Sequence, residues 1–232
     1  MPADAPIVLP SLPEAFGATR AALHLVAERI VAPARVAATG NEIALEAAPG
    51  GFGTPAFPDG GRVRVAGDEL VVVGADGVER RAVLTTLRAA AGLAGVPADG
   101  LDGARLAVDR AAADALGTLF AFAWDVLTAL RAEAPETAGA SAVRLWPEHF
   151  DVAFEQGSEA DGLRAGYGVS PGDGDHPDPY LYVGPWAERP ADPGWNATGF
   201  QGAELGYAEL RAAPDAHAAA LAFFRDRRGA LS

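Results

Sequence analysis

The residues around position 150 combine an imidazole with a carboxylate in a pattern typical of a β-strand. Alternate apolar residues predict a strand over 149–155, and a period of two then places His149 and Asp151 on its other face. A His and an Asp on one face can share a metal ion, or form a general base with the carboxylate that orients it. The same alternation is typical of any half-exposed antiparallel strand, whose polar side chains only meet water.

Tyrosines follow thirty residues later with the same spacing. Tyr180 and Tyr182 share one face of a predicted strand over 180–183, and pairing of this strand near 149–155 would bring them beside His149 and Asp151. Aromatic rings with a few acids and a histidine can line a site for a small polar ligand. Alternatively, the rings only anchor long Gly/Pro-rich loops. The predicted ligand-binding residues are Trp146, His149, Asp151, Tyr180, Tyr182 and Trp186.

An acidic loop between these strands has the residue types of a metal site. Asp173, Asp175 and His176 could supply oxygen ligands to Ca²⁺ or Mg²⁺, or mixed ligands to a transition metal. We expect no cofactor, and a divalent metal is the alternative that these residue types leave open. With His149 as a further ligand and Glu148 or Asp151 as the base, the same region could form a metal-assisted hydrolase.

Two further motifs match known patterns without their structural context. The G-x-G-x-x-A at 51–56 is followed by a turn and a strand, whereas a dinucleotide site requires a helix there. The G-x-S-x-G at 168–172 is followed by Pro177 and Pro179, which exclude the helix of a nucleophile elbow. We interpret both as turns.

The elements that would position these residues predict an α+β fold. An N-terminal helix over 14–31 ends at Pro33, and an antiparallel β-meander covers 62–84, with a type I′ turn at Asp76-Gly77. A short helix begins at Thr85 or Thr86 and ends near Gly92 or Gly95.

A long core helix covers 104–132, and a second β block covers 141–184. Its predicted strands are 143–146, 149–155, 163–169 and 180–183, and a C-terminal helix begins at Pro214-Asp215. We expect a single domain over 1–232, with two lobes, 1–135 and 136–232, as the alternative.

Composition excludes several classes of protein. The 232 residues contain no cysteine, which excludes disulfide scaffolds, thiolate metal sites and cysteine nucleophiles. The net charge of −13 without a basic block argues against nucleic acid and against membranes as partners. Residues 1–10 show no signal peptide, and Asp125 interrupts the apolar stretch 116–130, so we expect a cytoplasmic protein with a buried helix there.

The acidity is concentrated in one region. Residues 141–200 hold ten acids against three arginines, together with nine of the eighteen aromatic residues. This region has the least regular pattern of the chain, and loops often carry function. Nothing in the pattern specifies an oligomeric state.

Five segments resemble a family of uncharacterised proteins from high-GC actinobacteria. They are TRAALHLVAERI at 19–30, DGVERRAVL at 76–84, HFDVAF at 149–154, PYLYV at 179–183 and ELGYAELRAAPDAHAAALAFF at 204–224. Residues 90–140 do not contribute to the resemblance. The family has no assigned activity, so the resemblance implies no catalytic or binding residue. It favours a single unit that spans the chain.

The leading hypothesis is therefore a protein that binds a small polar ligand through residues 146–200. The metal-assisted hydrolase is the second hypothesis. The third is a structural module, or a homodimer face, without catalysis.

Overall fold

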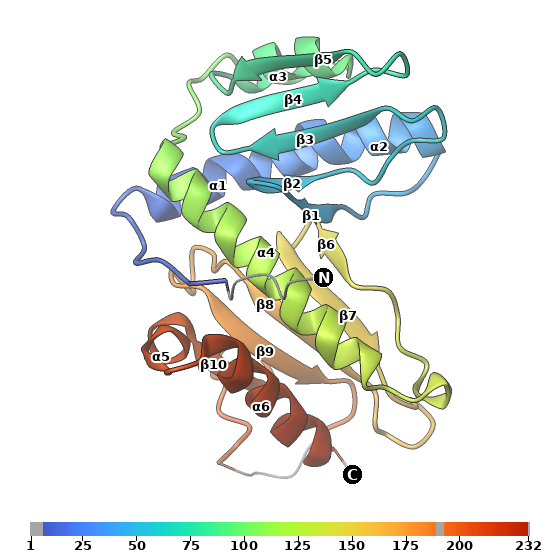
Figure 1. Ribbon diagram of the computed structural model, residues 1–232, viewed down its shortest axis with the longest axis vertical. Helices are drawn as coiled ribbons and strands as arrows, with labels where there is room; N and C mark the ends of the chain where they lie inside the picture. Colours follow the sequence, from blue (N-terminus) through green and yellow to red (C-terminus); the bar gives the residue numbers. More distant parts are fainter. Residues whose placement is uncertain (1–6, 189–192, 232) are drawn as a thin grey trace, which may run out of the picture. The chain divides into compact units, whose positions relative to one another are not determined.

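The computed structural model describes residues 7–188 and 193–231, which form two compact units. The first unit comprises Pro10–Ala121 and Leu145–Phe150, and the second comprises residues 7–9, Phe122–Arg144 and residues 151–231. The strands form two antiparallel five-stranded sheets, accompanied by helices (Figure 1). The predicted α+β class is confirmed. The single domain over the whole chain stays a prediction.

The first sheet follows the order of the chain, β1-β2-β3-β4-β5. Its strands are β1 (Glu46–Ala48), β2 (Gly51–Gly53), β3 (Arg62–Ala66), β4 (Glu69–Val73) and β5 (Glu79–Val83). The last three strands are the predicted meander, and alternate apolar residues such as Val63 and Leu70 are buried. The predicted type I′ turn is wrong. Gly77 takes a positive φ of 76° but Asp76 does not, and Gly74 N–H bonds to the Val78 carbonyl across a longer loop.

The strand β2 lies in a segment that the sequence analysis assigned to a loop. It is only three residues long and two of them are glycine, so no alternation marks it. Phe52 between those glycines is fully buried, and its ring packs against Phe120 and Phe150 at centroid distances of 6.1 and 5.2 Å. The dinucleotide-like glycines therefore belong to a core strand.

The N-terminal helix continues beyond its predicted end. It consists of α1 (Phe16–Val26), a π-helical turn η1 (Ala27–Val31) and α2 (Ala32–Thr39). Pro33 lies in the first turn of α2, where its missing N–H and its ring do no harm, so it does not end the helix. The short helix α3 (Leu87–Ala94) has the predicted boundaries: the Thr86 hydroxyl caps Ala89 N–H at 3.1 Å, and Gly95 ends it in the left-handed conformation.

The long helix α4 (Arg110–Ala132) begins six residues later than predicted. Asp109 accepts a hydrogen bond from Ala112 N–H at 2.9 Å and so acts as its N-cap, whereas residues 104–109 run without regular structure. The helix is long and apolar enough to cross a membrane, and 61% of its most apolar 18-residue window is buried inside the structure. The cytoplasmic location stays a prediction, and residues 1–6, on which the signal-peptide argument depends, lie outside the described residues.

The second sheet has the order β10-β9-β8-β7-β6. Its strands are β6 (Arg144–Trp146), β7 (Asp151–Gln156), β8 (Ala165–Ser170), β9 (Tyr180–Pro185) and β10 (Ala203–Gly206). β10 is not among the predicted strands, because a strand of four residues is too short for alternation to show. After β10 come α5 (Tyr207–Ala212), which was not predicted, and α6 (Ala216–Gly229), which begins directly after the predicted Pro214-Asp215. Asp215 caps α6 by accepting a hydrogen bond from Ala218 N–H at 2.9 Å.

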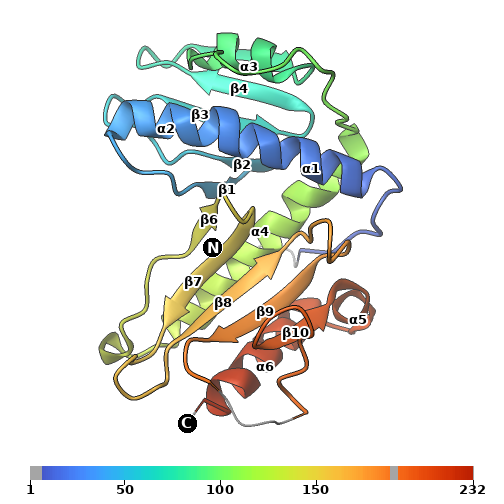
Figure 2. The same ribbon diagram turned by 180° about the vertical axis from the view of Figure 1, so that it is seen from behind.

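The two faces of the second sheet differ. One face carries the apolar residues of β7–β9, including Phe154 and Tyr167, whose rings stack at 5.4 Å, and Phe224 of α6 packs against Tyr167 at 6.2 Å. Figure 1 shows α6 and the C-terminal part of α4 in front of the sheet, and Figure 2 shows the sheet in front of these helices. We call the opposite side, which carries Asp151, Gly168, Tyr182 and their same-face neighbours, the helix-free face.

Candidate functional site

Strand register assembles the helix-free face from four strands. Gly168 of β8 lies between Ala153 of β7 and Tyr182 of β9, and Tyr182 in turn pairs with Glu204 of β10. Tyr180 pairs with Ser170 in the next row of this face. The tyrosine strand β9 does not pair with β7, because β8 lies between the two.

Tyr182 nevertheless reaches β7. A Cβ atom added at Gly168 would lie 2.3 Å from Cζ and 2.4 Å from the hydroxyl oxygen of Tyr182, so the ring lies directly over this glycine. The hydroxyl donates a hydrogen bond to Oδ2 of Asp151, whose side chain is only 5% exposed. The glycine thus allows a side chain from β9 to cross β8 and join a carboxylate two strands away.

The electrostatics of this pair keep the phenol protonated. Burial raises the pKa of the Tyr182 phenol well above its ordinary value, and the charge of Asp151 and the hydrogen bond to it raise it further. A phenol with a raised pKa donates hydrogen bonds but is a poor base and a poor nucleophile at neutral pH. The arrangement therefore suits binding better than proton abstraction.

A group of aromatic rings extends from this pair. The Tyr180 ring lies 6.2 Å from that of Tyr182 and 4.1 Å from the imidazole of His176. Phe200 lies 6.5 Å from Tyr180 and 6.1 Å from Tyr182, and 36% of its surface is exposed. We call Tyr180, Tyr182 and Phe200 the ring cluster.

Carboxylates surround the ring cluster. Burial raises the pKa of the Tyr180 phenol, a hydrogen bond with Ser170 opposes this, and the charges of Asp173, Asp151 and Glu204 raise it again. Ser170 is the serine of the elbow-like motif. It is buried, and its Oγ accepts a hydrogen bond from Gly172 N–H at 3.1 Å in a turn, so no helix follows it.

The acidic loop before β9 is held by local hydrogen bonds. Oδ1 of Asp173 accepts the N–H groups of Asp175 and His176, both at 2.8 Å, and Nδ1 of His176 lies 2.9 Å from the Asp178 carbonyl. Nε2 of His176 lies 3.6 Å from Oε2 of Glu204. Within residues 7–188 and 193–231, no group of three His, Asp or Glu side chains has the geometry of a metal site. The metal ligands Asp173, Asp175 and His176 stay a prediction.

The structure places His149 differently from Asp151. β7 begins at Asp151, and His149 and Glu148 lie exposed in the preceding turn. Phe150, which lies between His149 and Asp151, has a positive φ of 56°. This interrupts the alternation on which a shared face of His149 and Asp151 depended, so the predicted shared face is wrong. Phe150 instead points into the core of the first unit, where its ring stacks on His24 at 5.0 Å.

The two predicted tryptophans lie outside the ring cluster. Trp146 is half-buried at the end of β6. Trp186 follows β9 and is 54% exposed, with the guanidinium of Arg164 over its ring at 4.7 Å. Arg164 also bonds to Glu155, at 2.5 Å. This arginine occupies one face of the Trp186 ring.

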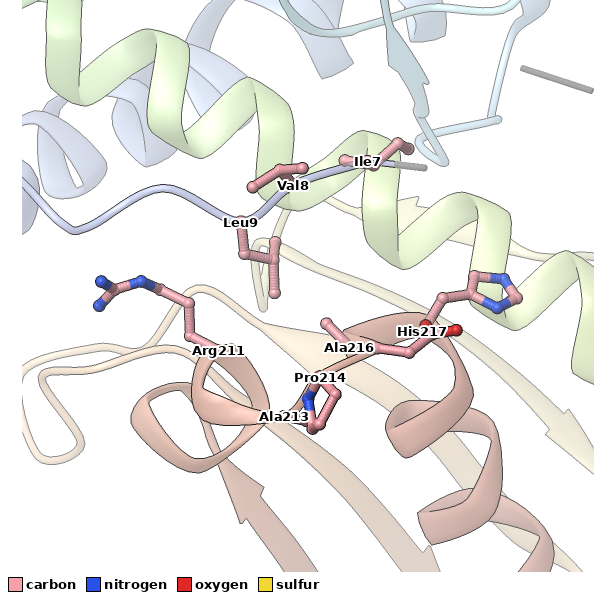
Figure 3. Close-up of a pocket in the computed structure, with 9 residues that line it drawn as sticks. Ile7, Val8, Leu9, Arg211, Ala213, Pro214, Ala216 and His217 are labelled. Carbon is pink, nitrogen blue, oxygen red and sulfur yellow. The ribbon is translucent and has the colours of Figure 1, made fainter. Parts of the chain in front are cut away.

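A cavity of about 270 Å³ lies elsewhere in the second unit. It is lined by residues 7–9, Arg211 and residues 213–217, as Figure 3 shows. The His217 ring, at the start of α6, pairs with Asp125 at 3.2 Å. None of the predicted site residues lines this cavity.

Sequence reasoning missed three residues of the site: Gly168, Phe200 and Glu204. A glycine in a strand can mark the close approach of another group, which is the signal that could have identified Gly168. Glu204 lies on the unpredicted strand β10 and Phe200 in the loop before it, so no periodicity pointed to either. Comparisons with protein-family models, curated proteins and solved structures found no match to the chain.

Proposed function

We propose that this protein binds a small polar ligand on the helix-free face of the second sheet, at the ring cluster. The observation that carries the proposal is Tyr182 lying across Gly168, with its hydroxyl on the buried carboxylate of Asp151. A buried carboxylate costs free energy unless it is well hydrogen-bonded. The apolar face of the sheet already holds α6 and needs no such pair.

The neighbouring groups support binding rather than catalysis. The ring cluster gives flat apolar contact area, and Glu204 and His176 give polar groups at its edge. Small-ligand sites combine these two kinds of surface. The phenols, with their raised pKa, act as hydrogen-bond donors.

A nuclear magnetic resonance titration tests the proposal. A fixed set of probes would be added to the full chain: choline, ethanolamine, glycerol, glucose, acetate and inorganic phosphate. We expect at least one of them to give saturable shifts of the backbone amides of β8 and β9, with the amides of β3 and β4 as the internal control. If no probe moves β8 and β9 more than β3 and β4, the proposal is wrong.

A variant separates the site from general surface binding. Phe200→Leu removes a ring of the cluster at a partly exposed position, so the protein should stay folded and lose the shifts. Phe223→Leu is the matched control, because Phe223 is also partly exposed but lies on α6. Equal effects of the two variants would contradict the proposal.

A further inference from the structure

The first sheet ends in a strand whose outer side is open. β5 is the last strand in the order β1-β2-β3-β4-β5, and its neighbour in that order is β4. In Figure 1 it lies at the outer edge of the sheet, with α3 behind it. All five of its residues are exposed, and the structure describes every residue from 10 to 121, which includes this whole sheet and its helices.

Backbone hydrogen bonds determine which groups of β5 point outward. At the two ends of its pairing with β4, Gly74 N–H bonds to the Val78 carbonyl at 3.0 Å, and Leu84 N–H bonds to the Asp68 carbonyl at 2.8 Å. Bonding groups alternate along an antiparallel strand, so the even-numbered residues of β5 bond to β4 and the odd-numbered ones point away. We call the outward N–H and C=O groups of Glu79, Arg81 and Val83 the free edge.

The free edge has the features of a strand that can pair. Among the described residues, none bonds to these N–H and C=O groups. Edge strands are often blocked by a proline, by a bulge or by a covering loop. β5 contains no proline, its pairing with β4 is continuous over five residues, and Val83 is 55% exposed. The free edge stops after Val83, because Leu106 N–H already bonds to the Thr85 carbonyl at 2.9 Å.

Charged side chains can also protect an edge, but those beside the free edge balance one another. Arg81 pairs with Glu79 and, at 3.4 Å, with Glu69, and Arg64 pairs with Glu79 at 3.5 Å. Residues 60–88 hold five arginines against four acids, in a chain whose net charge is −13. A second copy would bring the same balance of charge. A strongly charged peptide of either sign would leave most of its charge unmatched.

We propose that the free edge binds the free edge of a second copy of this chain, in antiparallel pairing about a two-fold axis at Arg81. Every outward residue is then paired: Glu79 lies opposite Val83 of the second copy, and Arg81 lies opposite its own equivalent. Each Arg81 keeps Glu69 and Glu79 of its own chain beside it, which offsets the like charge.

The register follows from the length of the free edge. A shift in one direction would bring Arg80 opposite Arg80 and leave Val83 without a partner in the free edge. A shift in the other direction would place Glu79 opposite Thr85, whose carbonyl is already occupied. In the register centred on Arg81, Arg80 instead lies opposite the small side chain of Ala82 on the other face of the strand. The free edge and the ring cluster lie in different units, so this inference does not depend on the proposed function.

Self-association of the full chain tests the inference. Two strands of this length bury less than a standard interface of about 1,200–2,000 Å², so the dimer should be weak. Sedimentation equilibrium up to a protein concentration of about 1 mM would measure its dissociation constant. On dilution, we expect the backbone amide signals of Glu79, Arg81 and Val83 to shift. The amides of the inner strands β2 and β3 are the internal control.

Two pairs of variants separate strand pairing from other contacts. Val83→Pro removes an outward N–H that makes no bond within the chain, so the monomer should fold. The dissociation constant should rise about tenfold or more. Val83→Thr keeps the N–H and the branched side chain, and as the matched control it should change the constant by less than about twofold. Ala82→Glu, opposite Arg80 of the second copy, should lower the constant about threefold, and Ala82→Arg should raise it by a similar factor.

Several outcomes would overturn the inference. A chain that stays monomeric up to about 1 mM has no such dimer. A dimer whose dilution shifts lie outside β5 uses another surface, and equal effects of Val83→Pro and Val83→Thr would exclude the outward N–H from the interface. If circular dichroism shows that Val83→Pro does not fold, the two substitutions of Ala82 decide. A dissociation constant that ignores the sign of the charge at this position contradicts the proposed pairing.

Discussion

The close contact between Gly168 and Tyr182 allows a sharp test by Gly168→Ala. The new methyl group would lie 2.3 Å from Cζ of the tyrosine, so the ring must rise by about 1 Å to reach ordinary van der Waals distance. This movement takes the hydroxyl away from Asp151, which is 5% exposed. The substitution therefore combines overpacking with the loss of a charged hydrogen bond.

The magnitude follows from these two effects. Overpacking of a filled site costs about 1–3 kcal/mol, and a hydrogen bond to a charged group contributes about 1.5–3 kcal/mol. Because the ring can relax towards solvent, the two effects overlap. Replacing glycine also stabilises by about 0.4–1 kcal/mol through the unfolded state. We expect a net loss of about 2–4 kcal/mol in the free energy of unfolding.

Urea denaturation followed by circular dichroism measures this loss, and two further variants control it. Gly184→Ala lies on the same face, where an added Cβ meets no atom within 4 Å, so its effect should stay within about 0.5 kcal/mol. Adding Tyr182→Leu to Gly168→Ala removes the clash, and we expect a coupling energy above about 1 kcal/mol. If Gly168→Ala is no worse than Gly184→Ala, or if the double variant is additive, the placement of the ring is wrong.

Four further predictions concern other parts of the structure. Gly117→Ala in α4 should destabilise by about 2 kcal/mol or more, because its Cβ would lie 2.6 Å from backbone. Gly92→Ala, at an open helical position, should stabilise by about 0.5–1 kcal/mol, as urea denaturation would report. Glu133→Gln should lose about 0.5–1 kcal/mol at pH 7. Hydrogen bonds from Arg225 lower the pKa of this carboxyl, so the loss should shrink as the pH falls below 4.5. Burial raises the pKa of Tyr207 to about 12 from 10.0, so its contribution to stability is complete below pH 10 and is lost as the pH rises towards 12. An ultraviolet titration should show that Tyr207→Phe removes a late-titrating phenol.

Features that depend on neighbours in sequence could be predicted. The meander of β3–β5 follows from local alternation, and the helix starts at Thr86 and Asp215 follow from side chains that cap the N–H three residues later. The shared face of Tyr180 and Tyr182 has the same origin. Each of these features depends only on residues within one hairpin, one strand or one helical turn.

Features that depend on contacts distant in sequence could not be predicted. A side-chain period of two assumes extended backbone. Phe150 breaks this period, because its backbone has a positive φ and its ring is buried in the core. Pro33 would end a regular helix, but the π-helical turn before it moves the proline into a first turn. β2 and β10 are too short for alternation to show.

The contrast between Gly168 and Gly184 explains why the site could not be read from the sequence. Both glycines lie in strands and on the same face, yet one lies under a tyrosine ring and the other under open space. The difference is set by Asp151, which lies two strands from Tyr182. Its carboxylate accepts a hydrogen bond from the Tyr182 hydroxyl and so keeps the tyrosine ring over Gly168.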